Sequence, residues 1–238
     1  MLQSVTLSKN LVTIGGSAFY NCDACDALGS IEIPKSLDSA TSVYRFNVVN
    51  DYGVFHNCDN LKTVTFEEGT TEVSIGLFAL CNGLEAIVIP DTVKRIEEKA
   101  FYLCTALQTV HIPDSVTRND VRTFHGSGLC TITIPGPVEE IGKYALEGCA
   151  SLTTVTWPSS LLTIPEYTFS GCTSLTTVNL PDNLTEIHKH AFINCDTLVT
   201  FTMPDSVTTM NENVFYDCDA LTDIHLSEKL QKINSNTF

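Results

Sequence analysis

One motif recurs along the whole chain, and it limits the possible folds more than any other feature of the sequence. Each copy begins at a leucine, and the copies start at residues 2, 28, 61, 84, 107, 129, 152, 175, 198 and 221. From the third copy onward, successive starts lie 22 or 23 residues apart. A unit of this length cannot bury its apolar side alone, whereas stacked neighbours share one continuous core. The chain is therefore predicted to be a repeat solenoid.

The copy at residues 84–106 shows the expected local structure. Leu84, Ile87 and Ile89 have the alternating apolar pattern of a short strand, which Pro90 then ends in a turn. A second short extended piece follows, and the apolar spacing of three to four residues over 97–104 predicts a helical turn. We therefore predict a β-rich fold with short helical turns, in which about ten stacked units form one curved, right-handed coil and one domain over residues 1–238.

Two columns of identical side chains run through the copies. Phenylalanine recurs at one position, as Phe19, Phe55, Phe78, Phe101, Phe124, Phe169, Phe192, Phe215 and Phe238, with Leu146 as the exception. Cysteine recurs three residues later, as Cys22, Cys58, Cys81, Cys104, Cys149, Cys172, Cys195 and Cys218, with Ser127 in one copy. We predict that both columns belong to the core and that the cysteines act as small buried hydrophobes. The sequence leaves two alternatives undecided: disulfides between neighbouring units, and a local disulfide or redox pair between Cys22 and Cys25.

The consensus LxxVxIPxxVxxIxxxAFxxC, best matched by residues 84–106, resembles the BspA-like class of leucine-rich repeats. The resemblance covers essentially the whole chain. Members of that family look like surface adhesins of bacteria and of some protists. The resemblance therefore implies a protein at the cell surface or secreted, which recognises host matrix proteins, cell-surface proteins or glycans. It transfers no functional residue, because the shared motif is all core.

Composition and motifs exclude several functions. The chain has 28 acidic and 13 basic residues, a formal net charge of −15, which argues against nucleic acid and against anionic membranes as partners. No apolar run is long enough to cross a membrane, and the first residues do not resemble a signal peptide. The sequence shows no metal site, no cofactor motif and no constellation of catalytic groups. We therefore predict a non-catalytic protein without a cofactor.

Two surfaces are candidates for binding a protein or glycan partner. The copy that begins at residue 28 has about ten extra residues within 38–53, which contain Tyr44, Arg45, Phe46 and Tyr52, types common at interface hot spots. The competing interpretation is a small hairpin packed on the solenoid. The second candidate is the outward side of the main strands, which carries Thr131, Thr133, Thr154, Thr156, Thr177, Thr200 and Thr202.

The two ends of the chain show no polar capping unit, although solenoids need caps for solubility. We expect a slice of a longer array. The alternative function is an intracellular or assembly scaffold that self-associates through uncapped ends or lateral contacts. Ten cysteines without a convincing pairing pattern would suit such a reducing, cytoplasmic setting.

Overall fold

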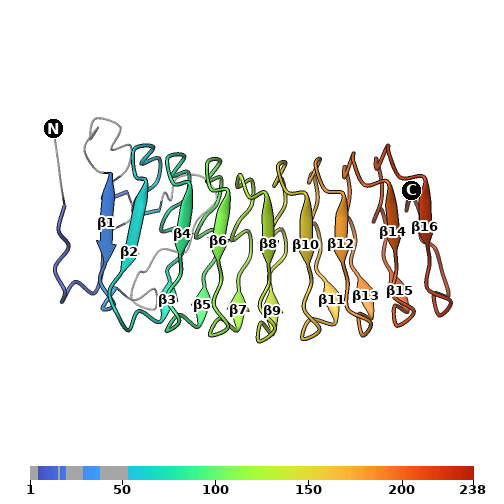
Figure 1. Cartoon of the computed structure of the whole chain (residues 1–238), viewed down its shortest axis with the longest axis horizontal. Helices are drawn as coiled ribbons and strands as arrows, with labels where there is room; N and C mark the ends of the chain where they lie inside the picture. Colours follow the sequence, from blue (N-terminus) through green and yellow to red (C-terminus); the bar gives the residue numbers. More distant parts are fainter. Residues whose placement is uncertain (1–4, 16, 20–28, 38–52) are drawn as a thin grey trace.

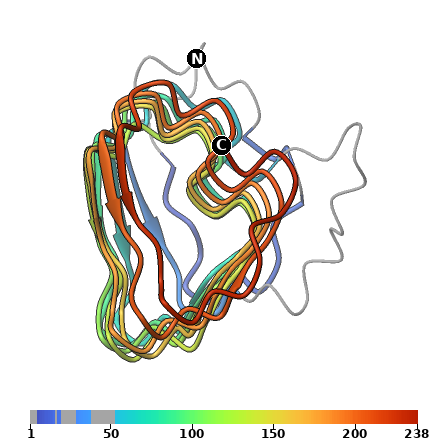
Figure 2. The same cartoon turned by 90° about the vertical axis from the view of Figure 1, so that its right-hand side faces the viewer.

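Two kinds of short parallel strand alternate along the chain and form two sides of a coil (Figure 1). The computed structural model describes residues 5–15, 17–19, 29–37 and 53–238. The predictions for Cys22, Cys25 and the insertion at 38–53 fall almost entirely outside these residues; only Gly53 of the insertion is described. Viewed along the coil, successive units overlay on one another, with the main strands along one side (Figure 2).

The main strands follow the leucine of each copy, where the alternating pattern predicts them. They are β1 (Ser30–Ile33), β2 (Thr63–Phe66), β4 (Ala86–Val88), β6 (Thr109–His111), β8 (Thr131–Thr133), β10 (Thr154–Thr156), β12 (Thr177–Asn179), β14 (Thr200–Thr202) and β16 (Asp223–His225). Alternate residues point inward and outward. In β8, Ile132 is therefore buried while Thr131 and Thr133 are exposed.

The second side of the coil consists of two-residue strands. These are β3 (Glu72–Val73), β5 (Arg95–Ile96), β7 (Arg118–Asn119), β9 (Glu140–Ile141), β11 (Thr163–Ile164), β13 (Glu186–Ile187) and β15 (Thr209–Met210). A proline turn joins the two sides, as where the Val93 N–H donates to the Pro90 carbonyl at 3.0 Å. Among the described residues, seven units carry both strands, so the structure has about seven complete turns rather than the ten predicted.

The prediction of short helical turns on the third side of the coil is wrong, because the described residues contain no helix. Lys99 and Leu103 both have left-handed backbone conformations, with φ of 57° and 55°, which interrupt any right-handed helix. Alternate N–H groups also bond to the next unit rather than within their own segment. The Phe101 N–H donates to the Thr123 carbonyl at 2.9 Å, whereas the Cys104 N–H closes a local turn onto the Phe101 carbonyl at 3.3 Å.

The predicted core columns are confirmed from Phe55 to Phe215, whereas Phe19 is half-buried and Phe238 is 55% exposed. Phe78, Phe101 and Phe124 are fully buried and stack in sequence, with ring centroids 5.7 and 5.4 Å apart. Leu146 interrupts this column, and stacking resumes from Phe169 toward the C-terminal units. The cysteine column lies beside it.

Each buried thiol of that column donates to a backbone carbonyl of the preceding unit. The Cys104 Sγ, for example, lies 3.0 Å from the Phe78 carbonyl oxygen. The described cysteines are free thiols, and those of the column are buried except for the half-buried Cys218. These bonds satisfy polar groups that the packing has removed from water.

Candidate binding face

The outward side chains of six main strands form a surface without charge. These strands are β4, β6, β8, β10, β12 and β14. Its first row is Ala86, Thr109, Thr131, Thr154, Thr177 and Thr200, and its second row is Val88, His111, Thr133, Thr156, Asn179 and Thr202. None of these twelve positions holds lysine, arginine, aspartate or glutamate. We call these two rows the threonine face. A neutral surface of this extent is notable in a chain with a formal net charge of −15.

The structure brings the seven sequence-predicted threonines together on this face. Thr131, Thr154 and Thr177 are directly opposite one another in register, as are Thr133, Thr156 and Asn179. All seven are exposed except Thr154, which is half-buried. The Asn179 Nδ2 donates to the Thr156 hydroxyl at 3.5 Å, so polar groups interact along a row. The other sequence-predicted residues, Tyr44, Arg45, Phe46 and Tyr52, lie outside the described residues.

Charged side chains are paired on the side of the coil that carries the short strands. The Arg95 guanidinium lies 3.1 Å from Glu72 and 2.8 Å from Glu97. The burial of the Glu97 carboxyl raises its pKa, and the nearby guanidinium opposes that shift. On the third side, the Lys143 Nζ lies 2.9 Å from Glu166. The pKa of Glu166 is lowered by this hydrogen-bonded contact.

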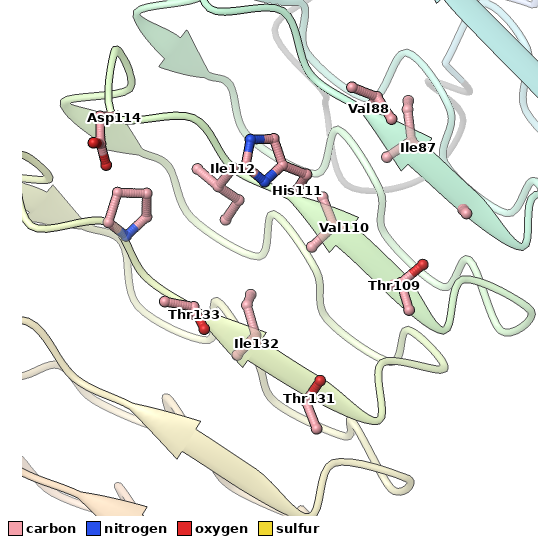
Figure 3. A pocket seen from close by; sticks show the side chains of 12 residues that line it. Ile87, Val88, Thr109, Val110, His111, Ile112, Asp114, Thr131, Ile132 and Thr133 are labelled. Carbon is pink, nitrogen blue, oxygen red and sulfur yellow. The ribbon is translucent and has the colours of Figure 1, made fainter.

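A hollow of about 460 Å³ opens on the threonine face across β4, β6 and β8. It is lined by Ala86, Ile87, Val88, Thr109, Val110, His111, Ile112, Asp114, Thr131, Ile132, Thr133 and Pro135. Figure 3 shows Val88 and His111 on neighbouring strands, Thr131 and Thr133 along β8, and Asp114 beyond the end of β6. Val88 is 70% exposed, the highest value among the exposed large apolar residues of the described part of the chain.

The hollow coincides with a break in the sheet. β4 pairs with β6, and β8 pairs with β10, but β6 and β8 are not joined in a ladder. Between these two strand regions, one backbone hydrogen bond is formed, from the Cys130 N–H to the Gln108 carbonyl at 3.2 Å. The inward-pointing Val110 is half-buried, whereas Ile132 on β8 is 4% exposed.

The repeat itself is shorter at this break. The starts at Leu107 and Leu129 are 22 residues apart, one fewer than in the adjoining copies. In the shortened turn, Gly128 lies so close to the preceding unit that a Cβ there would be 2.1 Å from the Thr105 carbonyl oxygen. Val88 and His111 occupy outward strand positions that hold threonine in other units, so residue type alone does not predict the hollow. The shortened spacing was the signal that could have drawn attention to this place.

A second feature that the repeat pattern does not predict is a stack of polar and aromatic side chains on the third side of the coil. Arg122 lies 4.2 Å from the centre of the Tyr144 ring, and the Tyr144 and Tyr167 rings stack 4.9 Å apart. His190 continues the stack 4.5 Å from Tyr167, and its Nε2 lies 2.9 Å from the Asn213 amide. Burial lowers the pKa of His190. Because each inner ring face is covered by a neighbour, this stack is mainly structural.

The described residues offer little for catalysis. Burial raises the pKa of the Cys104 thiol to about 12 and that of Cys149 to about 11, so neither forms a thiolate near neutral pH. No group of three or more histidine, cysteine, aspartate or glutamate side chains in the described ranges is arranged to hold a metal ion. A membrane-spanning helix is also not found among these residues.

Comparison with known families supports the repeat assignment. The BspA type Leucine rich repeat region matches the sequence in 6 copies, over residues 1–50, 47–153 and 139–238. The chain belongs to the BspA type leucine-rich repeat family. None of the curated proteins in the comparison matches it.

Solved structures of bacterial leucine-rich repeat proteins have a similar fold. One from Bacteroides ovatus is 25% identical with a TM-score of 0.67, and the match covers 99% of this chain and 76% of that one. The T. pallidum leucine-rich repeat protein is 23% identical with a TM-score of 0.58, covering 82% of this chain and 78% of that one. One from Eubacterium ventriosum is 22% identical with a TM-score of 0.56, covering 87% and 60% respectively.

Proposed function

We propose that this BspA type repeat chain is a non-catalytic binding module that contacts a protein or glycan ligand through the threonine face. The observation that carries the proposal is the absence of charge from twelve adjoining outward positions of a strongly acidic chain. Charged residues are depleted at the centres of protein interfaces, because their desolvation is costly. The family resemblance supports a location at the cell surface or outside the cell.

The chemistry of the threonine face suits such a role. Each threonine hydroxyl can donate and accept a hydrogen bond, so a row of them can pair with sugar hydroxyls or with a partner's backbone. The strands hold the rows in register before a ligand arrives, which reduces the entropy lost on binding. An extended face of this kind would act through many weak contacts rather than one deep pocket.

The experiment compares binding of three proteins to arrays of immobilised matrix proteins and glycans. Thr156→Lys places a charge within the threonine face, and Thr209→Lys makes the same change at an exposed strand position on the other side of the coil. We expect the first variant to lose binding and the second to retain it. Retained binding by Thr156→Lys would refute the proposal.

A further variant addresses the other candidate surface. It carries Tyr44→Ala, Arg45→Ala and Phe46→Ala together, within the insertion. We expect this triple variant to bind as the unmodified protein does. If it alone loses binding, the contact surface is the insertion and not the threonine face.

A further inference from the structure

We propose that the hollow across β4, β6 and β8 receives an aromatic side chain of a partner protein, with a lysine or arginine of that partner beside it. This inference rests on the proposed function, because it assumes that the threonine face is the contact surface. It goes further by choosing a protein over a glycan and by stating which chemical group enters the hollow.

The size and lining of the hollow favour an apolar group. Its volume of about 460 Å³ lies within the range of sites that bury a small ligand, and it accommodates one large side chain. Its walls include Val88, which points outward and is 70% exposed. A partner that covered Val88 would remove apolar surface from water, which favours association.

The carboxylate of Asp114 at the edge of the hollow favours a positively charged group of the partner. Asp114 is the only carboxylate among the lining residues, and lysine and arginine are absent from them. Asp114 is exposed and forms no ion pair with any described residue, in contrast to the paired carboxylates around Arg95. The formal net charge of −15 also attracts a basic partner over longer distances.

Polar groups around the hollow suit the edge of an aromatic residue. The hydroxyls of Thr131 and Thr133 lie on β8 at one side of the hollow, and the His111 imidazole lies on β6, the middle of its three strands (Figure 3). Tyrosine and tryptophan combine a large apolar body with one polar atom, and together with arginine they dominate interface hot spots. An aromatic residue next to a basic one therefore matches both the apolar wall at Val88 and the carboxylate of Asp114 at the edge of the hollow.

The test uses four defined probes and the backbone amide signals of the ¹⁵N-labelled protein. The probes are N-acetyl-Gly-Trp-Lys-Gly-amide, the same peptide with Glu for Lys, the same peptide with Ser for Trp, and methyl β-glucoside. We expect the Trp-Lys peptide to shift the amide signals of residues 86–88, 109–112 and 131–133. The Trp-Glu peptide should bind more weakly, by up to about fivefold, which corresponds to the loss of one surface ion pair.

Two matched pairs of variants test separately how Val88 and Asp114 contribute to peptide binding. Asp114→Asn should abolish the preference for Trp-Lys over Trp-Glu, whereas Asp182→Asn, which also follows a turn proline, lies outside the hollow and should preserve it. Val88→Lys should weaken binding of the Trp-Lys peptide, whereas Val199→Lys, at another exposed valine, should not.

Each contrary outcome has a defined meaning. Equal binding of the Trp-Lys and Trp-Glu peptides, or amide shifts located elsewhere, would overturn the inference. Absence of any peptide shift would also overturn it. If only methyl β-glucoside shifts these amide signals, the inference fails while the proposed function stands. If Thr156→Lys also leaves array binding unchanged, both fail.

Discussion

The stacked phenylalanine column yields a quantitative prediction at Phe101. The ring is fully buried between Phe78 and Phe124, at centroid distances of 5.7 and 5.4 Å and interplanar angles of 16° and 3°. Leucine at this position keeps most of the apolar volume but removes both ring pairs, which at about 0.5–1.5 kcal/mol each amounts to about 1–3 kcal/mol. Alanine also leaves a cavity and should lower the free energy of unfolding by about 3–5 kcal/mol.

The assay is urea unfolding, followed both by circular dichroism and by the fluorescence of the only tryptophan, Trp157, which packs edge-on against Phe169 at 5.6 Å. With a slope of about 2 kcal/mol per M, Phe101→Leu should lower the midpoint by about 0.5–1.5 M. Coincident transitions by the two probes would show that the loss spreads beyond the mutated unit.

The control for this prediction is Tyr216→Leu, which replaces an aromatic ring that is 40% exposed. It should change the stability by no more than about 0.5 kcal/mol. If Phe101→Leu costs no more than Tyr216→Leu, the reasoning is refuted, and the rings contribute only through their buried area.

Three further predictions concern a close backbone contact and the thiols. Gly128→Ala should destabilise by about 1–3 kcal/mol in the same urea assay, because its Cβ would lie 2.1 Å from a carbonyl oxygen, whereas Gly136→Ala meets nothing within 4 Å and should be neutral. Because burial raises the pKa of Cys104 to about 12, its contribution to stability should be constant below about pH 9 and decline as the pH rises toward 12, since the unfolded thiol ionises first. Cys104→Ser should show a smaller decline. Iodoacetamide should label the exposed Cys130 in the native protein and Cys104 only after unfolding, as read by peptide mass spectrometry; rapid native labelling of Cys104 would contradict this.

The sequence predicts the strands and the core well, because the buried positions recur at fixed spacings and hold apolar residues. Trp157, for instance, falls at an inward position of the repeat and is 2% exposed in the structure. The threonines of β8 and β10 likewise follow from pleat alternation alone.

The third side of the coil could not be predicted in the same way. Ala100, Phe101 and Cys104 have helical spacing, but their packing arises from turns that use left-handed residues. Lysine and leucine at those positions, Lys99 and Leu103, are not residue types that favour a left-handed backbone, so their identity contains no warning. The lateral hydrogen bonds that require this conformation appear only once units are stacked.

The hollow could not be predicted from the sequence for a related reason. The residues that line it come from three successive units, and it lies where β6 and β8 do not join in a ladder. The one-residue shortening between Leu107 and Leu129 is visible in the sequence, but its effect on strand pairing is not.

The interruptions of the two sheets have a mechanical consequence. The main-strand side is broken between β2 and β4, between β6 and β8, and between β12 and β14, whereas the short-strand side is broken between β9 and β11. No two breaks fall at the same junction, and lateral bonds such as that from Phe124 to Ala145 cross the third side at each of these junctions. Where one side of the coil lacks a ladder between two units, the other sides still join those units by hydrogen bonds. Tension along the coil is thereby shared among many units rather than concentrated at one seam.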